Sequence, residues 1–269
     1  MKIVSSKNKL VKYIHREKSL GFVPTMGALH SGHLSLIKRS NSQCQKTIVS
    51  IFINKPQFNK KCDFQMYPRV IKKDISLLRK LKIDFLYLPT TNQIYPDGQN
   101  KNIKISAFAK KLCGKFRPGH FESVVDVVDR FIKIINPRKI YFGEKDMQQL
   151  KIIESFVKKD HPKTEVIGCK TVREENGIAC SSRNFLLSTN EKNIASKIYK
   201  LIINRKQNLI KNKYNLKTLK RKIYKFGVKR IDYIKIIDVN KLIKPYIKKN
   251  KYKIFIAYYL GTTRLIDNV

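Results

Sequence analysis

The fold is decided by the stretch Leu20-Gly21-Phe22-Val23-Pro24-Thr25-Met26-Gly27-Ala28-Leu29-His30-Ser31-Gly32-His33. Its apolar start, residues 20–23, predicts a strand, and the amphipathic run at 34–38 predicts the beginning of a helix. A helix N-terminus presents free backbone N–H groups and the positive end of the helix dipole, which suit a phosphate. His30 and His33 share one face of the helix start, and the glycines let the backbone come close to a ligand. The turn between strand and helix therefore predicts a phosphate site equipped for chemistry at a nucleotide.

The pair of histidines is the least specific part of this turn. Two ordinary histidines at a capped helix start would give the same His-x-Gly-His pattern. The chain has only five histidines in 269 residues, however, and two of them occupy this one turn directly behind an apolar run. This placement favours a functional interpretation over a structural one.

Short apolar runs rich in Ile, Val, Phe and Tyr alternate with helical patterns along the first two thirds of the chain. Alternating strands and helices predict an α/β domain built on a parallel sheet. In such a sheet the ligand crevice lies at the carboxyl ends of the strands, where the motifs at 24–33, 54–58 and 143–149 fall. The predicted strands are 20–23, 47–53, 84–88, 139–142 and 165–169, and the predicted helices are 33–44, 72–82, 121–135, 146–158 and 190–211.

The pattern changes after residue 184. A basic helical stretch over 190–225 is followed by two strand-like runs, 231–239 and 253–260. This order predicts a smaller α+β domain at the C-terminal end. We therefore expect two domains, 1–184 and 185–269.

The net charge is extreme, because 58 Lys and Arg residues against 19 Asp and Glu residues give +39. Such an excess would suit a surface that binds nucleic acid. The excess is mostly Lys and is accompanied by abundant Ile and Asn, as a biased base composition would also produce. It runs through the whole chain, with +21 over 1–184 and +18 over 185–269, and no nucleic-acid-binding motif accompanies it. We favour compositional bias, with only incidental nucleic-acid binding at low salt.

No run of the sequence approaches the roughly 20 apolar residues that a membrane span requires. The first residues lack the apolar centre of a signal peptide. The five cysteines lie far apart without a Cys-x-x-Cys pair, which argues against a disulfide framework and against a zinc site. These features predict a soluble cytoplasmic protein that has no membrane partner.

Polar residues follow two further predicted strands. Asn54 and Gln57 follow the second strand, and amides, which both donate and accept, could orient a hydroxy acid without adding charge. Lys145 follows the fourth strand, where a cation could neutralise a phosphate as charge develops. Such patterns also occur in ordinary polar turns, and Asp146 has a simpler interpretation as a helix cap.

Two more segments carry cationic and hydroxyl groups. Ser181, Ser182 and Arg183 stand next to one another and could grip a polyphosphate, although a Ser-Ser-Arg loop is common in any protein. Arg117 and His120 bound a Pro-Gly turn before a predicted helix. For His120, a structural role at the helix start is an equal alternative.

The order of these motifs is more specific than any one of them. The chain carries, in sequence, Pro-Thr-Met-Gly-Ala-Leu-His-Ser-Gly-His, Ser-Ile-Phe-Ile-Asn-x-x-Gln-Phe, Asp-Phe-x-x-Tyr-Pro-Arg, Arg-Pro-Gly-His-Phe, Tyr-Phe-Gly-Glu-Lys-Asp-x-Gln-Gln-Leu, Thr-Val-Arg-Glu and Ser-Ser-Arg-Asn. This series strongly resembles the pantoate–β-alanine ligases, also called pantothenate synthetases, over essentially the whole chain. The end of the chain, 263–268, fits the family as well.

The resemblance implies a Rossmann-like nucleotidyltransferase domain with a smaller C-terminal domain, usually in a homodimer. It implies condensation of (R)-pantoate with β-alanine, dependent on ATP and Mg²⁺, through pantoyl adenylate. The products would be pantothenate, AMP and pyrophosphate. A related nucleotidyltransferase for a small phosphate ester is one alternative; it would share the His-x-Gly-His turn but not the pair Gln57 and Gln149. A nucleic-acid-binding protein is the second alternative, and it rests on the net charge alone.

The same resemblance implies roles for individual residues. The catalytic residues would be His33, as proton donor, with His30 and Lys145. Gln57 and Gln149 would hold pantoate, Gln57 would also meet β-alanine, and Asn54 would join this substrate site. The ATP-binding residues implied by the family pattern are Met26, Gly27, Ala28, Leu29, His30, Ser31, Gly32, His33, Gly143, Glu144, Lys145, Asp146, Val172, Cys180, Ser181, Ser182 and Arg183.

Three positions depart from the family pattern. Lys55 stands where the family usually has Pro, and Cys180 replaces a larger apolar residue. Lys73 and Asp74 stand where the family tends to carry two acids near the metal and the triphosphate. We therefore expect Asp74 to remain as a metal contact, with Mg²⁺ held mainly by phosphates and water.

Overall fold

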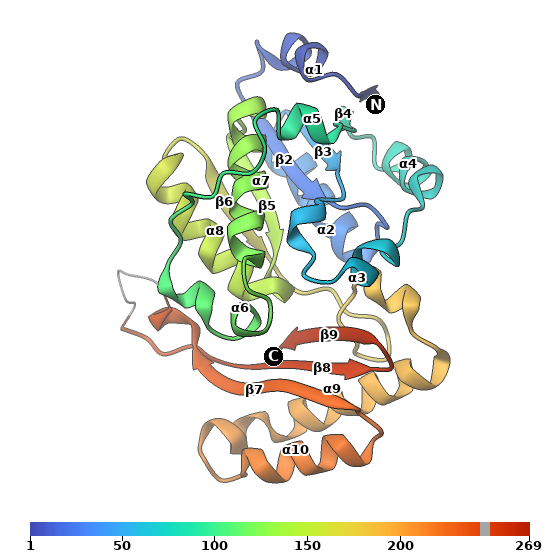
Figure 1. Ribbon diagram of the computed structural model, residues 1–269, viewed down its shortest axis with the longest axis vertical. Helices are drawn as coiled ribbons and strands as arrows, with labels where there is room; N and C mark the ends of the chain where they lie inside the picture. The colour runs from blue at the N-terminus through green and yellow to red at the C-terminus, as the bar shows by residue number, and fades with distance from the viewer. Residues whose placement is uncertain (243–247) are drawn as a thin grey trace. The chain divides into compact units, whose positions relative to one another are not determined.

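The computed structural model describes residues 1–242 and 248–269. The chain forms two compact units, shown in Figure 1. Unit 1 comprises residues 1–144 and 148–170, and unit 2 comprises residues 145–147 and 171–269. The division that we predicted between residues 184 and 185 therefore falls inside unit 2.

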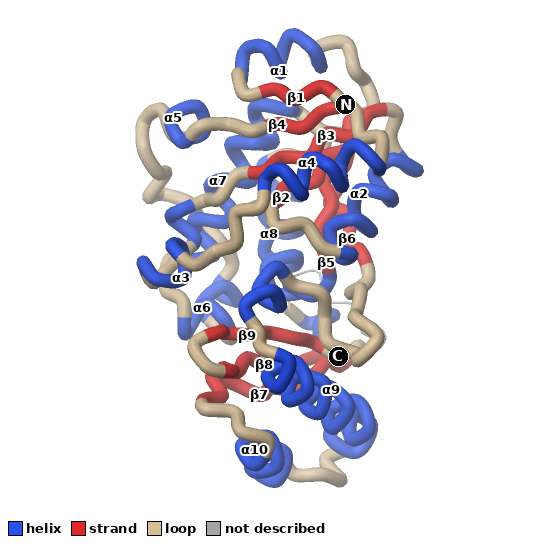
Figure 2. Tube along the Cα trace, turned by 90° about the vertical axis from the view of Figure 1, so that its right-hand side faces the viewer, coloured by secondary structure: helices blue, strands red, loops and turns tan. Residues whose placement is uncertain are grey.

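Unit 1 is built on a six-stranded sheet whose strands run in the order β1-β4-β3-β2-β5-β6 (Figure 2). Every pairing in this sheet is parallel, which confirms the predicted α/β class. The strands are β1 (Lys2–Val4), β2 (Leu20–Thr25), β3 (Lys46–Ile51), β4 (Phe85–Tyr87), β5 (Lys139–Gly143) and β6 (Glu165–Cys169). All five predicted strands are present, whereas β1 is too short for its apolar pattern to predict it.

Helices connect these strands. They are α1 (Lys7–Ile14), α2 (Ser31–Gln43), α3 (Lys61–Gln65), α4 (Ile71–Lys80), α5 (Thr91–Ile94), α6 (Cys113–Phe116), α7 (His120–Ile135) and α8 (Met147–Asp160). Single 3₁₀ turns lie at η1 (Lys55–Gln57), η2 (Ala107–Lys110) and η3 (Glu144–Asp146). Within the described residues, no helix combines the length and the apolar composition that crossing a bilayer demands.

The two faces of the sheet carry alternate residues of each strand, because successive side chains of a strand point to opposite sides. Val23 and Val49 share a buried cluster with Ile37 of α2 and Leu78 of α4. On the opposite face, Phe131 of α7 lies against Phe22, the residue before Val23 in β2, with 5.3 Å between ring centroids. The sheet is therefore covered by α2 and α4 on one side and by α7 on the other.

Helix α2 packs closely on β2. Gly21 faces Ser40 of α2, and a Cβ at this position would overlap the Ser40 hydroxyl oxygen. The same hydroxyl is hydrogen-bonded to Thr47 Oγ1 of β3 at 2.8 Å. This close approach holds the last turns of α2 against the start of β2, at the opposite end of both elements from the His-x-Gly-His turn.

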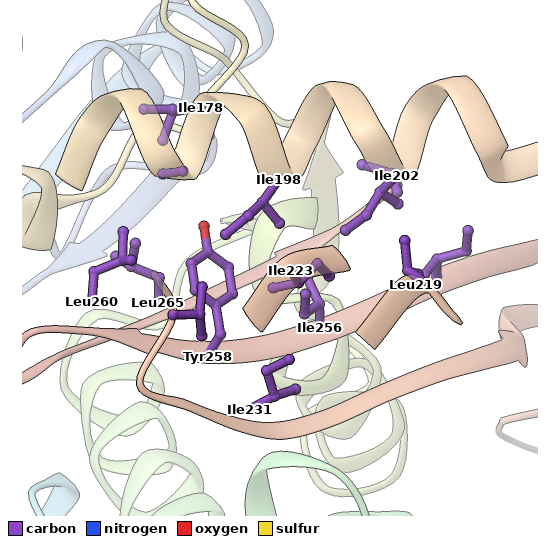
Figure 3. Close-up of a cluster of buried hydrophobic side chains, with 14 of the residues drawn as sticks. Ile178, Ile198, Ile202, Leu219, Ile223, Ile231, Ile256, Tyr258, Leu260 and Leu265 are labelled. Atoms are coloured by element: carbon purple, nitrogen blue, oxygen red, sulfur yellow. The ribbon is translucent and has the colours of Figure 1, made fainter. Parts of the chain in front are cut away.

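Unit 2 contains an antiparallel sheet in the order β7-β8-β9. Its strands are β7 (Arg230–Asp238), β8 (Tyr252–Leu260) and β9 (Thr263–Asn268), its helices are α9 (Thr189–Ile210) and α10 (Leu216–Lys225), and its 3₁₀ turns are η4 (Ser182–Leu186) and η5 (Val239–Lys241). Figure 3 shows Ile198 and Ile202 of α9 above Tyr258 and Ile256 of β8 in one buried cluster. Ser188 and Glu191 form a capping box at the start of α9, as expected for a helix that begins after a turn.

The segment 171–184 belongs to unit 2 because its contacts are with the C-terminal strands. Arg173 donates to both carboxylate oxygens of Asp267, at 2.8 Å and 3.0 Å. Arg173 also forms an isolated antiparallel bridge with Ala179, and Ile178 is buried in the cluster of Figure 3. The predicted boundary placed this segment in the first domain, because the sequence pattern does not reveal partners such as Asp267, which lies 94 positions from Arg173.

Candidate active site

The carboxyl ends of β2, β3 and β5 meet at one edge of the parallel sheet, since these strands are neighbours. Thr25 ends β2 opposite Ile51, the last residue of β3. The Thr25 hydroxyl donates to the Ser50 carbonyl oxygen at 2.7 Å, which ties the two strand ends together. The turn at 26–33, the turn at 54–57 and Gly143 therefore lie at the same edge, as we predicted for a ligand crevice.

The turn after β2 is held by a buried carboxylate. Gly27 and Ala28 both have positive φ angles, 78° and 51°, and this conformation is costly for a residue with a side chain. Asp74, from α4, accepts hydrogen bonds from the backbone N–H groups of Ala28 and Leu29, both at 2.8 Å. Asp74 is 1% exposed. Two charge-assisted bonds thus hold the strained turn in place.

Several backbone N–H groups of this turn are engaged within the protein, contrary to the free donors that we predicted for a phosphate. The Ala28 and Leu29 groups point at Asp74. The Gly27 N–H donates to Thr25 Oγ1 at 3.1 Å, and the Gly32 N–H donates to His30 Nδ1 at 3.1 Å. The donors that this turn can offer to an anion therefore include its imidazoles rather than these four backbone groups.

His30 is the N-cap of α2. Because His30 Nδ1 accepts a hydrogen bond from Gly32, the neutral ring carries its proton on Nε2. The rings of His30 and His33 lie 4.0 Å apart, centroid to centroid, at 35° to each other. Both side chains are half-buried, as is Met26, whereas Leu29 is buried and Ser31 is exposed. The structure therefore brings the two predicted histidines together with an N–H donor at His30.

The geometry of Asp74 does not support its predicted role at Mg²⁺. Both of its oxygens are bound to backbone N–H groups. Within the described residues there is no group of three His, Cys, Asp or Glu side chains placed to hold a metal ion. Lys73, its neighbour, is exposed on α4. These residues do not fit a metal site built by protein ligands, and Asp74 instead shapes the turn.

Asn54 also differs from its predicted role. It is 1% exposed, and its amide nitrogen donates to Gln57 Oε1 at 2.9 Å and to the Ser123 carbonyl oxygen at 3.2 Å. Its amide oxygen accepts from the Tyr95 hydroxyl at 2.8 Å. Asn54 therefore orients Gln57, which is half-buried, rather than contacting a substrate itself. Tyr95 gave no signal in the sequence.

Arg117 and His120 hold the backbone of Gln57. Arg117 Nη2 and His120 Nδ1 both donate to the Gln57 carbonyl oxygen at 2.9 Å. Arg117 Nη1 lies 2.9 Å from His120 Nε2, which must accept from the guanidinium, so His120 is neutral. Of the two alternatives for His120, the structural one matches this geometry.

The strand β5 leads into the next predicted motif. Gly143, Glu144 and Gln149 are half-buried. The Lys145 Nζ atom lies 3.5 Å from Asp146 Oδ1. The Lys145 carbonyl oxygen accepts from Asn268 Nδ2 at 2.7 Å. The last residues of the chain therefore fix the backbone of the predicted catalytic lysine, a contact that sequence spacing does not reveal.

Near and distant contacts within unit 2 hold the predicted polyphosphate segment. Cys180 is buried, and its N–H donates to the Val172 carbonyl oxygen at 3.0 Å. Ser181 caps η4 by accepting from the Arg183 N–H at 3.3 Å. Ser182 is buried, and Arg183 Nη1 donates to the Arg264 carbonyl oxygen at 3.2 Å. The residues of the Ser-Ser-Arg motif are therefore held in place on a 3₁₀ turn.

Known proteins resemble this chain along its whole length. The family model described as pantoate-beta-alanine ligase matches residues 2–269. The pantothenate synthetase of Sulfurihydrogenibium sp. (strain YO3AOP1) is 42% identical over 262 residues, which cover 94% of this chain and 92% of the relative. The pantothenate synthetase of Pseudothermotoga lettingae is 40% identical, with 100% of this chain and 97% of the relative covered.

Solved structures agree with these matches. The pantoate-beta-alanine ligase of Francisella tularensis, complexed with beta-gamma ATP and β-alanine, has a TM-score of 0.86 and 38% identity, covering 100% of this chain and 97% of that one. The pantothenate synthetase of Thermus thermophilus has a TM-score of 0.88 and 33% identity, covering 100% of this chain and 99% of that one. Sequence and fold thus point to one family across both units. The chain belongs to the pantoate–β-alanine ligases.

Proposed function

We propose that this chain condenses (R)-pantoate with β-alanine, using ATP, through a pantoyl-adenylate intermediate. In the first step an oxygen of the pantoate carboxylate attacks the α-phosphorus of ATP, and the bond to the pyrophosphate oxygen breaks. In the second step the β-alanine amine attacks the activated carbonyl carbon, loses a proton and releases AMP. The products are pantothenate, AMP and pyrophosphate.

The observation that supports this proposal most directly is the pair of adjacent, tilted imidazoles, His30 and His33, at the sheet edge that also holds the oriented amide of Gln57. His30 Nε2 and His33 supply N–H groups for the phosphates, and His33 donates the proton in the adenylation step. Donors fixed in advance are most effective where charge develops in the transition state. Gln57 and Gln149 hold pantoate, and Gln57 also meets β-alanine.

The remaining predicted residues serve ATP. Lys145, with Ser181, Ser182 and Arg183, balances the charge that develops on the leaving pyrophosphate. Hydrogen bonds within the protein hold the Lys145 backbone and the Ser-Ser-Arg turn, and groups held in this way lose less entropy on binding a ligand. The other proposed ATP contacts are Met26, Ser31, Gly143, Glu144, Asp146, Val172 and Cys180. Gly27, Ala28, Leu29 and Gly32 are also proposed to line the ATP site, but through atoms other than their N–H groups, which are bound within the protein.

Three further features complete the proposal. Mg²⁺ enters only as the counter-ion of the ATP phosphates, because it prefers phosphate and water oxygens, and no residue is assigned to it. The enzyme works in the cytoplasm. It forms a homodimer, as the resemblance to its family implies.

An isotope experiment tests the intermediate. When pantoate carries ¹⁸O in its carboxylate, each AMP is expected to contain one labelled oxygen, because that oxygen stays on phosphorus when the amide forms. AMP and pantothenate should appear in equal amounts by mass spectrometry, and only when all three substrates are present. Unlabelled AMP would exclude the adenylate, and ADP with inorganic phosphate would indicate an acyl phosphate instead.

The basic surface is expected to bind nucleic acid only incidentally. Residues 192–231 contain 14 Lys and Arg residues and no Asp or Glu, so a short fluorescent DNA strand should bind at low salt. Binding that rests on phosphate contacts falls steeply with salt and should be lost by about 0.2 M. The measurement is fluorescence anisotropy during a salt titration. Tight binding that persists at that salt concentration would favour a second function for this surface.

A further inference from the structure

A main-chain carbonyl fixes the orientation of the Asn54 amide. Ser123, in the first turn of α7, places its carbonyl oxygen 3.2 Å from the Asn54 amide nitrogen. A carbonyl oxygen only accepts hydrogen bonds, so the amide atom that meets it has to be Nδ2 and not Oδ1. Asn54 is buried, so its amide cannot turn over to find other partners in water.

This orientation dictates the direction of the next two hydrogen bonds. Asn54 Nδ2 donates to Gln57, and the Gln57 atom at 2.9 Å must therefore be its oxygen, Oε1. Asn54 Oδ1 can only accept, so the Tyr95 hydroxyl at 2.8 Å must be the donor. One carbonyl of α7 thus sets the polarity of three side chains in a row.

Tyr95 is well suited to donate permanently. Its side chain is buried, and burial raises the pKa of its hydroxyl well above the usual range, so the proton is kept in neutral solution. The Arg130 guanidinium lies 4.6 Å from the centre of the Tyr95 ring and is itself bound to Asp126 at 2.6 Å. These contacts hold the ring, so the hydroxyl remains directed at Asn54.

We propose that Tyr95 is a positioning residue that, with the Ser123 carbonyl, makes Gln57 face its substrate as a hydrogen-bond donor. The Gln57 oxygen is committed to Asn54, and the amide NH₂ group is what this half-buried side chain offers to a ligand. A donor at this position favours binding of a carboxylate or hydroxyl oxygen of a hydroxy acid. It disfavours binding of a substrate group that can only donate hydrogen bonds. The inference rests on the proposed function, since it concerns how pantoate is held.

The sharpest test is Gln57→Glu measured across pH. Asn54 still donates to one Glu oxygen, and the other oxygen faces pantoate. An ionised glutamate side chain at this position would repel the pantoate carboxylate, whereas a protonated one would donate a hydrogen bond to pantoate. With an ordinary glutamate pKa of about 4.3, the activity of the variant relative to the parent should rise about tenfold for each pH unit between pH 7.5 and 5.5. If Gln57 instead faced the substrate as an acceptor, Gln57→Glu would keep its activity at pH 7.5 with a flat ratio, and the proposal would be overturned.

The second test addresses Tyr95. Tyr95→Phe removes only the hydroxyl and leaves the buried Asn54 Oδ1 without its donor, which weakens the hydrogen-bonded chain that positions Gln57. We expect kcat/KM for pantoate to fall about tenfold while the KM for ATP is unchanged. Tyr87→Phe is the matched control, because Tyr87 is another buried tyrosine of unit 1 and its hydroxyl donates to Gln93 at 3.5 Å. Equal pantoate kinetics in Tyr95→Phe, Tyr87→Phe and the parent would overturn the proposal.

Assays of the unmodified chain distinguish a failure of the positioning inference from a failure of the proposed function. If the unmodified chain forms AMP and pantothenate but Gln57→Glu shows no pH dependence, the positioning inference fails and the proposed function stands. If the unmodified chain forms neither product from pantoate, β-alanine and ATP, the proposed function itself fails. The melting temperature of each variant is compared with that of the parent, so that a loss of activity can be distinguished from a loss of fold.

Discussion

His33→Ala is expected to lower kcat/KM for pantothenate formation by about 10²- to 10⁴-fold, the range that a positioned proton donor contributes. His33 lies in the first turn of α2, with its ring 4.0 Å from that of His30. In the mechanism that we propose, its removal takes away the proton donor of the adenylation step. AMP formation should fall together with pantothenate, because adenylation precedes amide formation. The measurement is initial rate of pyrophosphate release at saturating ATP.

A matched pair of variants tests whether this loss is chemical. His15→Ala removes an exposed histidine whose Nδ1 atom lies 2.7 Å from the Lys12 carbonyl oxygen at the end of α1, and it should leave the rate unchanged. His30→Asn keeps a side-chain oxygen that can cap α2 but removes the imidazole Nε2. We expect the melting temperature of His30→Asn to stay near that of the parent while its rate falls. A normal rate in both His33→Ala and His30→Asn would contradict the assignment of the two histidines.

The second large effect is on stability, and Asp74→Ala should produce it. The substitution leaves the buried N–H groups of Ala28 and Leu29 without acceptors, beside two residues with positive φ angles. Buried donors without acceptors cost about 1–3 kcal/mol each, so the free energy of unfolding of unit 1 should fall by about 3 kcal/mol. Activity should fall too, because the turn leads directly into His30. Denaturant unfolding with amide exchange at Ala28 and Leu29 gives the measurement, and Ser76→Ala, at an exposed position of the same helix, is the control.

Asp74→Asn distinguishes a carboxylate that positions the turn from one that binds metal. The amide oxygen can serve one backbone N–H, while the amide nitrogen meets the other as a second donor, so stability should fall less than in Asp74→Ala. If Asp74 acts only through the turn, raising the Mg²⁺ concentration will not restore the activity of Asp74→Asn. Recovery of the rate at high Mg²⁺ would instead indicate that Asp74 contacts the metal ion.

The sequence determined the class of the fold and its family. The apolar runs at 20–23, 47–53 and 139–142 predicted the central strands, because a buried parallel strand requires consecutive apolar side chains. The positions of the polar motifs directly after these strands placed them at one sheet edge without any tertiary information. The order of the motifs identified the family, because each motif is a short run of residues that can be recognised in the sequence without knowledge of the fold.

Only the tertiary structure decided what the polar groups do. Asp74 reaches the 28–29 turn from 46 positions along the chain, Tyr95 reaches Asn54 from 41 positions away, and Arg173 joins Asp267 across 94. A hydrogen bond depends on where two atoms meet in space, and the residue types alone do not record the partner. The sequence therefore predicted Asp74 and Asn54 as ligand-binding residues, whereas packing buries both and directs their polar atoms at the protein itself. The limit is physical: periodicity encodes which residues are buried, but the folded chain decides which donors and acceptors satisfy one another.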